Sequence, residues 1–179
     1  WARRMSTETA TLPILLAPDA RLRAKAKPVA PNDPRVPALA ERMLATMYKA
    51  PGIGLAAPQV GEALRLVVVD VHPNEQPDPL VLVNPEIVAA SKEEAVREEG
   101  CLSLPGQFAD VARPAMVKVR WTDLSGAKRE LEADGLLAVC LQHEIDHLDG
   151  VLFVDHLSAL KRNMILRKLA KELKAKARD

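Results

Sequence analysis

Aromatic side chains are scarce in this sequence, where 48% of the 179 residues are hydrophobic but only 3% are aromatic. We therefore expect a mostly aliphatic core, large enough for one domain without disulfides. Apolar runs of transmembrane length are missing, because proline or a charged residue interrupts every candidate. The N-terminus lacks the apolar core of a signal peptide, and the formal net charge of +1 gives no general sign of nucleic-acid binding. These absences favour a cytoplasmic enzyme that contacts no membrane, and we expect a monomer.

Cysteine is also rare, with only Cys101 and Cys140 present. Their number permits a disulfide, but a reducing cytosol favours a thiolate metal ligand or a buried thiol. At the N-terminus, Met5 resembles a natural start. We expect residues 1–4 to come from translation that begins upstream of the natural start codon, or from an expression vector. We therefore take residues 5–179 as the domain.

The chain pattern predicts an α+β fold with antiparallel strands packed around a central helix, followed by a C-terminal helix. Residues 5–34 are rich in proline and predict an extended wrapping segment. A first helix should begin near Asp33-Pro34 and end at Pro51-Gly52. The central helix should run from Asp134-Gly135 to about His147 and be buried, because it is apolar on most sides. The last helix is expected from about Ser158 to Ala177.

Strands are expected at valine-rich or alternating segments between these helices. The expected ranges are 64–71, 80–83 (ended by Asn84-Pro85), 117–121 and 128–132, the last two joined by a turn at Ser125-Gly126. Residues 52–61 hold close glycines and a proline, which predict a loop whose backbone approaches another group. Within that loop, Gln59 is a polar residue among small apolar neighbours, although an ordinary turn would account for the glycines.

The segment from His143 to His147 has the HExxH pattern. Two histidines four residues apart project from the same face of a helix, where both can bind one metal ion. Glu144 is turned about 100° round the axis, so it can reach a metal-bound water as a general base. Two buried histidines bonded to backbone are the alternative, and the complete pattern on an apolar helix favours the metal site.

A catalytic site of this kind needs a third protein ligand, and that ligand distinguishes the enzyme classes. One protease class has the spacing HxxxHxxGxxH. This chain has Gly150 at the position of the glycine, but Phe153 stands where the last histidine should be. Another protease class uses a later glutamate, for which Glu172 is the first candidate, late in a basic helix. Upstream, a Cys101 thiolate would complete a Cys-His-His site.

Three segments together resemble the motifs of peptide deformylases, which read GφGφAAPQ, EGCφS and QHEφDH, where φ is apolar. They are residues 52–59 (GIGLAAPQ), 99–103 (EGCLS) and 142–147 (QHEIDH), in the family's order. The similarity extends from about Pro13 to the end of the chain. It implies a hydrolase that removes the formyl group from N-formylmethionine of nascent polypeptides and releases formate.

The resemblance also implies the roles of individual residues. The metal ligands would be Cys101, His143 and His147, and Glu144 would be the general base that later protonates the leaving amine. The Gln59 side chain and the Leu102 backbone N–H would stabilise the oxyanion. The family's usual ion is Fe²⁺, with Zn²⁺, Ni²⁺ or Co²⁺ as plausible substitutes.

The methionine side chain would occupy a pocket that, by the same resemblance, is lined by Ile53, Leu136, Val139, Cys140 and the edge of His143. Gly54 would receive the substrate backbone. Core packing alone would give the same apolar stripe on the helix, so each pocket residue taken singly can belong to either. Glu99 is expected to pair with Arg113 behind the site, although both charges can instead be solvated.

The last helix is strongly basic. Its charges can simply form a solvated face, or they can dock the enzyme to ribosomal RNA, as the C-terminal helix does in similar enzymes. Two other functions remain open at the level of sequence. A zinc endopeptidase would retain its metal after Cys101→Ala, whereas the Cys-His-His site would lose it. A binding module without activity is disfavoured by the intact ligands, Glu144 and Gln59.

Overall fold

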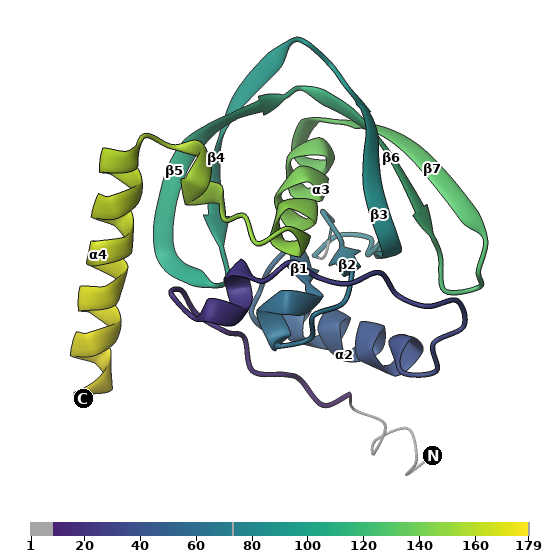
Figure 1. Cartoon of the computed structure of the whole chain (residues 1–179), viewed down its shortest axis with the longest axis horizontal. Helices are drawn as coiled ribbons and strands as arrows, with labels where there is room; N and C mark the ends of the chain where they lie inside the picture. Colours follow the sequence, from purple (N-terminus) through teal and green to yellow (C-terminus); the bar gives the residue numbers. More distant parts are fainter. Residues whose placement is uncertain (1–8, 73, 179) are drawn as a thin grey trace.

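The computed structural model of the chain describes residues 9–72 and 74–178 (Figure 1). The expectation about residues 1–4 and a start at Met5 lies outside these residues. Within the described part of the chain, no helix is long and apolar enough to cross a membrane.

The described residues form two antiparallel sheets and three α-helices. The helices are α2 (Val36–Lys49), α3 (Gly135–Leu148) and α4 (Ala159–Ala177), with short 3-10 helices η1 (Ala20–Arg23), η2 (Ala57–Val60) and η3 (Phe153–His156). The five-stranded sheet has the order β1-β2-β3-β6-β7, formed by β1 (Gly54–Ala56), β2 (Leu66–Val69), β3 (Leu80–Ala90), β6 (Met116–Thr122) and β7 (Lys128–Asp134). The two-stranded sheet pairs β4 (Glu94–Cys101) with β5 (Leu104–Pro114). The α+β prediction is confirmed.

Helix α3 lies at the centre of the molecule, between the β4–β5 hairpin and the larger sheet (Figure 1). Strand β2 packs against a different helix on each face of the sheet. Its residues Val67 and Val69 belong to the core that contains Leu141 and Leu148 of α3. Leu66 and Val68 point the other way, into the core that contains Met43 and Met47 of α2. All four strand residues are buried, and this burial on both faces explains the unbroken apolar run.

The segment before α2 wraps around the domain, as its proline content predicts. Its backbone N–H groups donate to four carbonyl oxygens in three distant segments: Leu15 to Gln59, Lys27 to Ala63, Ala17 to Ser103 and Ala26 to Leu148. The wrapping segment is therefore fixed by main-chain hydrogen bonds rather than by a regular sheet.

Two strand predictions need correction. Residues 52–61 are not all loop, because Gly54–Ala56 form the edge strand β1 and residues 57–60 form η2. Strand β3 does not end at Asn84-Pro85 but continues to Ala90. Asn84 adopts φ +51° and the pairing register shifts there, so the proline falls in a bulge. The Asn84 side chain also accepts from the Val29 N–H at 2.7 Å and donates to the Val29 carbonyl at 3.0 Å.

The β4–β5 hairpin is absent from the sequence-based expectations. Strand β4 carries mostly exposed charged residues, and β5 contains a glycine and two prolines. Neither segment shows a clean apolar alternation, so local pattern alone does not indicate a strand. The hairpin matters for function because Cys101 is the last residue of β4.

Candidate metal centre and cleft

The centre of the site is the C-terminal half of α3. His143 and His147 project from the same side of the helix, and their ring centroids are 5.0 Å apart. Both are buried, as are nine of the fourteen residues of α3. The four-residue spacing explains the common side, because it closes about one helical turn.

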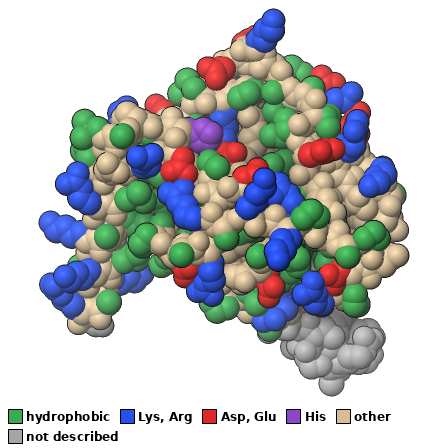
Figure 2. Space-filling model, in the orientation of Figure 1, with side chains coloured by type: hydrophobic (Ala, Val, Ile, Leu, Met, Phe, Trp, Pro, Cys, Tyr) green, Lys and Arg blue, Asp and Glu red, His purple; other side chains and the backbone are tan. Residues whose placement is uncertain are grey.

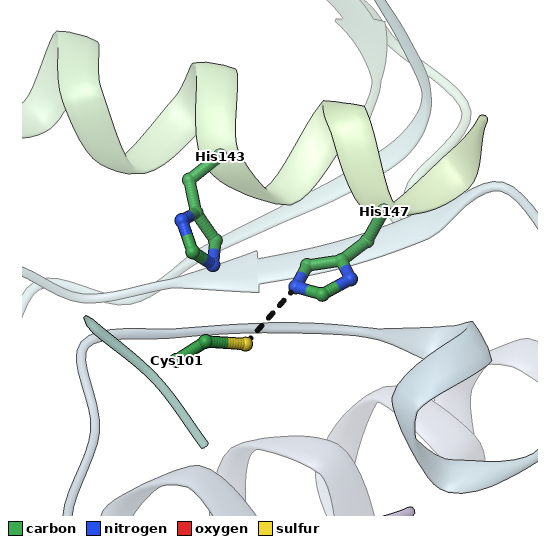
Figure 3. A group of neighbouring side chains, drawn as sticks. All are labelled: Cys101, His143 and His147. Carbon is green, nitrogen blue, oxygen red and sulfur yellow. Dashed lines mark hydrogen bonds between the residues drawn. The ribbon is translucent and has the colours of Figure 1, made fainter. Parts of the chain in front are cut away.

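Cys101 approaches these rings from the end of β4. Its Sγ lies 3.3 Å from His147 Nε2, and the three side chains point toward one another (Figure 3). One ligand atom of each residue lies within 4.8 Å of the others. Ligands of a tetrahedral ion with bonds of about 2.0–2.3 Å stand about 3.5 Å apart. The arrangement therefore fits a metal ion with little adjustment, and the donor set leaves a fourth position open.

The His143 ring is oriented by a buried acid. His143 Nδ1 lies 3.0 Å from Glu99 Oε1, which leaves Nε2 to face Cys101 and His147. Glu99 in turn accepts from Arg113 Nε at 2.6 Å and Nη2 at 2.9 Å, and both charged side chains are buried. This confirms the expected Glu99–Arg113 pair. Burial alone would raise the pKa of Glu99, but hydrogen bonds from His143 and Arg113 outweigh it and lower the pKa. The carboxylate is thus kept charged behind the histidine ligand.

Two members of this network are not identified by the sequence. Asp146 Oδ2 accepts from Arg113 Nη1 at 2.8 Å, and His156 Nε2 lies 2.8 Å from the same oxygen. Asp146 is part of the QHEIDH segment, which is the only signal that could have pointed to it. His156 on η3 carries no local signal, since only the fold brings it to α3.

Glu144 is buried beside the histidines. Its Oε1 has no hydrogen-bond partner among the described residues. Burial raises its pKa to about 7, which is near the value that suits a general base at neutral pH. An uncompensated buried carboxylate oxygen is costly, and the Glu144 side chain lines the cavity from which a bound group could reach it. His147 Nδ1 is likewise buried without a partner in the described structure, and burial lowers the pKa of this histidine well below its usual value. A neutral imidazole is the form that binds a metal.

Gly54 lies directly opposite Glu144. A Cβ atom built on Gly54 would stand 2.6 Å from Glu144 Oε2 and 2.8 Å from Cys140 Sγ. No side chain fits there, which accords with the expected close approach of the backbone at this glycine.

Gln59 faces the thiol from the other side. Its Oε1 accepts from the Ala56 N–H at 2.9 Å, and this bond fixes which end of the amide faces the site. Its Nε2 donates to Ser103 Oγ at 3.1 Å and lies 3.6 Å from Cys101 Sγ. Ser103 is fully buried and was missed as a positioning residue, although it belongs to the EGCLS segment. Leu102, whose backbone N–H is the second expected donor, lines the same cavity.

The site opens into a cavity of about 660 Å³. The five predicted substrate-contacting residues all line it: Ile53, Gly54, Leu136, Val139 and Cys140. The structure corrects one detail, because Leu136 on the first turn of α3 is 43% exposed and lies at the rim rather than in the buried core. Cys140 and Cys101 are both free thiols, and burial raises the pKa of Cys140 well above its usual value.

The two protease-type third ligands lie elsewhere. Phe153 is fully buried, with its ring stacked on His143 at a centroid distance of 6.1 Å. Glu172 accepts a hydrogen bond from Gln107 Nε2 at 2.9 Å, and the metal-type cluster found in the described residues contains no glutamate. The geometry thus favours Cys101 as the third ligand over both alternatives.

Comparison with known proteins gives one consistent result. The sequence model of the polypeptide deformylase family matches residues 11–163. Among curated relatives, the peptide deformylase of Rhodopseudomonas palustris (strain BisB5) is 56% identical over 164 residues, covering 90% of this chain and 94% of the relative. That of Mesorhizobium japonicum is 53% identical over 166 residues, covering 92% and 94%.

Solved structures agree with the sequence comparisons. A peptide deformylase from Legionella pneumophila superimposes with a TM-score of 0.89 at 49% identity, covering 95% of this chain and 99% of the other. One from Synechococcus elongatus in complex with actinonin gives 0.83 at 47% identity, covering 88% and 86%.

Proposed function

The chain belongs to the peptide deformylase family, whose members are metal-dependent hydrolases that remove the N-formyl group from nascent polypeptides, and we propose that Cys101, His143 and His147 hold the metal of that reaction here. The observation that carries this assignment is the convergence of the three ligand atoms within 4.8 Å, beside a buried carboxylate. A divalent ion supplies Lewis-acid chemistry, polarising a carbonyl oxygen and making water a nucleophile near neutral pH.

Glu144 is the proposed general base and general acid. Its Oε1, which has no hydrogen-bond partner among the described residues, can take a proton from the attacking water and later give it to the leaving amine. Water adds to the formyl carbon, the C–N bond breaks, and the products are formate and a free N-terminal amine. The proton that Glu144 removes from the water is the one that it delivers to the leaving amine nitrogen.

The oxyanion donors are the Gln59 amide and the Leu102 backbone N–H. The bond from the Ala56 N–H to Gln59 Oε1 supports this role, since it holds Nε2 toward Cys101. Donors fixed in advance stabilise developing charge without reorganisation, and one such donor is worth about 10²–10³ in kcat.

The formylmethionine side chain would occupy the apolar wall formed by Ile53, Val139 and Cys140, with Leu136 closing the rim. Gly54, on the edge strand β1, would receive the substrate backbone, because any larger residue there would meet Glu144.

The direct test is formate release from a formyl-Met peptide by protein purified without oxygen. We expect release by the wild type, and a loss of at least about 10²-fold in Glu144→Ala with its metal content unchanged. Cys101→Ala should lose the metal itself. Retention of metal by Cys101→Ala would contradict the ligand assignment, and no release by the metal-loaded wild type would contradict the function.

We propose Fe²⁺ as the native ion, with Zn²⁺, Ni²⁺ or Co²⁺ as substitutes. One thiolate and two imidazoles suit all four ions, so availability decides among them. Elemental analysis of protein purified without oxygen should find iron, and exposure to air should reduce activity through oxidation of the thiolate site. Stoichiometric zinc in such a preparation would contradict the assignment of iron.

We also propose that α4 docks the enzyme to ribosomal RNA. Figure 2 shows basic side chains gathered on the surface of this helix. Its sequence contains seven of them: Lys161, Arg162, Arg167, Lys168, Lys171, Lys174 and Lys176. The one acid on the helix, Glu172, is hydrogen-bonded to Gln107. Docking here would bring the site to emerging chains in the cytoplasm, and a monomer suffices because one chain supplies every site residue.

The docking proposal is tested with two triple variants. Lys168, Lys171 and Lys174 changed to Glu should reduce ribosome affinity about tenfold or more at fixed salt. Changing Lys25, Lys92 and Lys128 to Glu alters the net charge equally on exposed sites outside α4 and should have little effect. Equal losses in the two variants would contradict docking through the helix.

A further inference from the structure

Asp70 is a buried carboxylate that the proposed reaction does not use. It directly follows β2 and is 1% exposed. The Tyr48 hydroxyl donates to its Oδ2 at 2.5 Å, and the backbone N–H groups of His72 and Asp78 donate to the same carboxylate at 2.9 and 3.2 Å. Burial alone would raise the pKa of Asp70, but these hydrogen bonds lower it, so the carboxylate is charged. Hydrogen bonds to a charged acceptor are strong, and Tyr48 is therefore held firmly.

The bond from Tyr48 fixes one end of a wall of the substrate cavity. Tyr48 lies near the end of α2, and residues 50–53, which follow it, line that cavity. The other end of this wall is fixed by Asp70 as well, because its backbone N–H donates to the Ile53 carbonyl oxygen at 2.8 Å. Asp70 thus holds the wall at both ends, through its side chain at Tyr48 and through its main chain at Ile53.

The Ile53 carbonyl also connects the two sides of the proposed methionine pocket. The Cys140 thiol on α3 donates to this oxygen at 3.5 Å. Ile53 and Cys140 are opposite walls of that pocket, so the width between them depends on where the Ile53 carbonyl is held. Small changes of fit matter in an apolar pocket, where one methylene contributes about 10- to 200-fold to discrimination between substrates.

A simpler explanation is that Asp70 only stabilises the loop after β2. Aspartate commonly accepts from backbone N–H groups in turns, and the bonds from His72 and Asp78 have this character. The turn does not require the third bond, which comes from a different element. The Tyr48 hydroxyl therefore indicates a second role for Asp70, at the end of α2.

We infer that Tyr48 and Asp70 are positioning residues that set the width of the methionine pocket, so that discrimination between N-formylmethionine and smaller formylated residues depends on them. The inference rests on the proposed function, because that reaction places formylmethionine between Ile53 and Cys140. The cavity is lined by residues 50–53 but not by Tyr48 or Asp70. Both residues therefore act through the wall rather than on the substrate.

The test measures kcat/KM for formyl-Met-Ala-Ser and for formyl-Ala-Ala-Ser on the zinc-loaded holoenzyme. Tyr48→Phe removes the hydroxyl and keeps the ring. We expect the ratio of the two values to fall about three- to tenfold, which is at or below the lower end of the effect of one methylene. Both peptides are measured on one preparation, so any difference in the active fraction of the protein cancels in the ratio.

Thr46→Val is the matched control on the same helix. Thr46 is 4% exposed, and its hydroxyl accepts from the Leu12 N–H at 2.9 Å and donates to the Arg42 carbonyl at 2.6 Å. The substitution also removes a hydroxyl from α2, but one that faces the wrapping segment instead of the cavity wall. It should leave the ratio unchanged. An unchanged ratio in Tyr48→Phe, or an equal fall in Thr46→Val, would overturn the inference.

A double variant tests whether the two residues act together. Asp70→Asn removes the charge that holds the hydroxyl and should also lower the ratio. Residues that act through one contact have effects that do not add. The ratio in Tyr48→Phe/Asp70→Asn should therefore fall no further than in the more damaging single variant. Losses that multiply would show that the two residues act separately and would overturn the shared role.

A binding measurement distinguishes failure of this inference from failure of the proposed function. The same two peptides are titrated calorimetrically into zinc-loaded Glu144→Gln, with and without Tyr48→Phe. A preference for the formyl-Met peptide in Kd that decreases in Tyr48→Phe supports the inference, even if the wild type releases no formate. A preference that is absent, or that does not depend on Tyr48, overturns it whatever the activity.

Discussion

Replacing Arg113 with leucine should be one of the most destabilising single changes in this protein. Arg113 donates to both oxygens of Glu99 and to Asp146, at distances of 2.6–2.9 Å. The side chains of Arg113 and Glu99 are only 5% and 3% exposed, so water cannot replace the lost partner. Removing one member of a buried pair costs about 3–5 kcal/mol, because a charge is left buried without compensation.

The measurement is urea unfolding of the chelator-treated protein, which separates the fold from the metal. The matched control is Arg120→Leu, whose partner Glu130 is 3.1 Å away but whose pair is 52% and 40% exposed. An exposed pair contributes about 0–1 kcal/mol. We therefore expect the Arg113 variant to lose several times more unfolding free energy than the Arg120 variant.

Metal affinity gives a second measurement on the same variant. Glu99 orients His143, and loss of such outer partners weakens metal binding about 10–100-fold. Arg113→Leu should therefore bind zinc more weakly, and Arg120→Leu should not. If both variants unfold at the same urea concentration and bind zinc equally well, the buried network does not stabilise the site and the reasoning is refuted.

Three further changes test individual contacts. Gly54→Ala puts a methyl group against Glu144 and Cys140, so kcat/KM for a formyl-Met peptide should fall at least about tenfold; unchanged kinetics would mean that the backbone need not approach there. Gly150 has φ +76°, and a Cβ atom there would overlap the Arg23 carbonyl oxygen. Gly150→Ala should therefore destabilise the fold by about 1–3 kcal/mol, measured in urea. A loss below about 0.5 kcal/mol, the size of a neutral surface change, would count against this prediction. Phe153→Ala removes the ring stacked on His143 and should cost about 3–5 kcal/mol, measured in the same way; a stable variant would show that the cavity collapses.

Local pattern was sufficient for the helices and for part of the site. The predicted helices at residues 34–50, 134–147 and 158–177 agree with α2, α3 and α4 to within about two residues. Capping residues and a 3.6-residue period are local properties, so short windows of sequence contain them. The strands were harder: the β4–β5 hairpin was missed, and β3 runs through a proline because a bulge with Asn84 at positive φ accommodates it.

The sequence alone determined the pairing of His143 with His147 and the place of Glu144 beside them, because helical periodicity fixes relations over one turn. Through its motifs it also indicated the family. Only the tertiary structure shows how the ligand named by those motifs and the groups behind it reach these residues. Cys101 meets His147 across 46 positions of sequence, after a register shift between Gly100 and Cys101. Asp146 meets Arg113 across 33 positions of sequence. Such contacts depend on strand register and helix packing over long separations, and no local pattern encodes them.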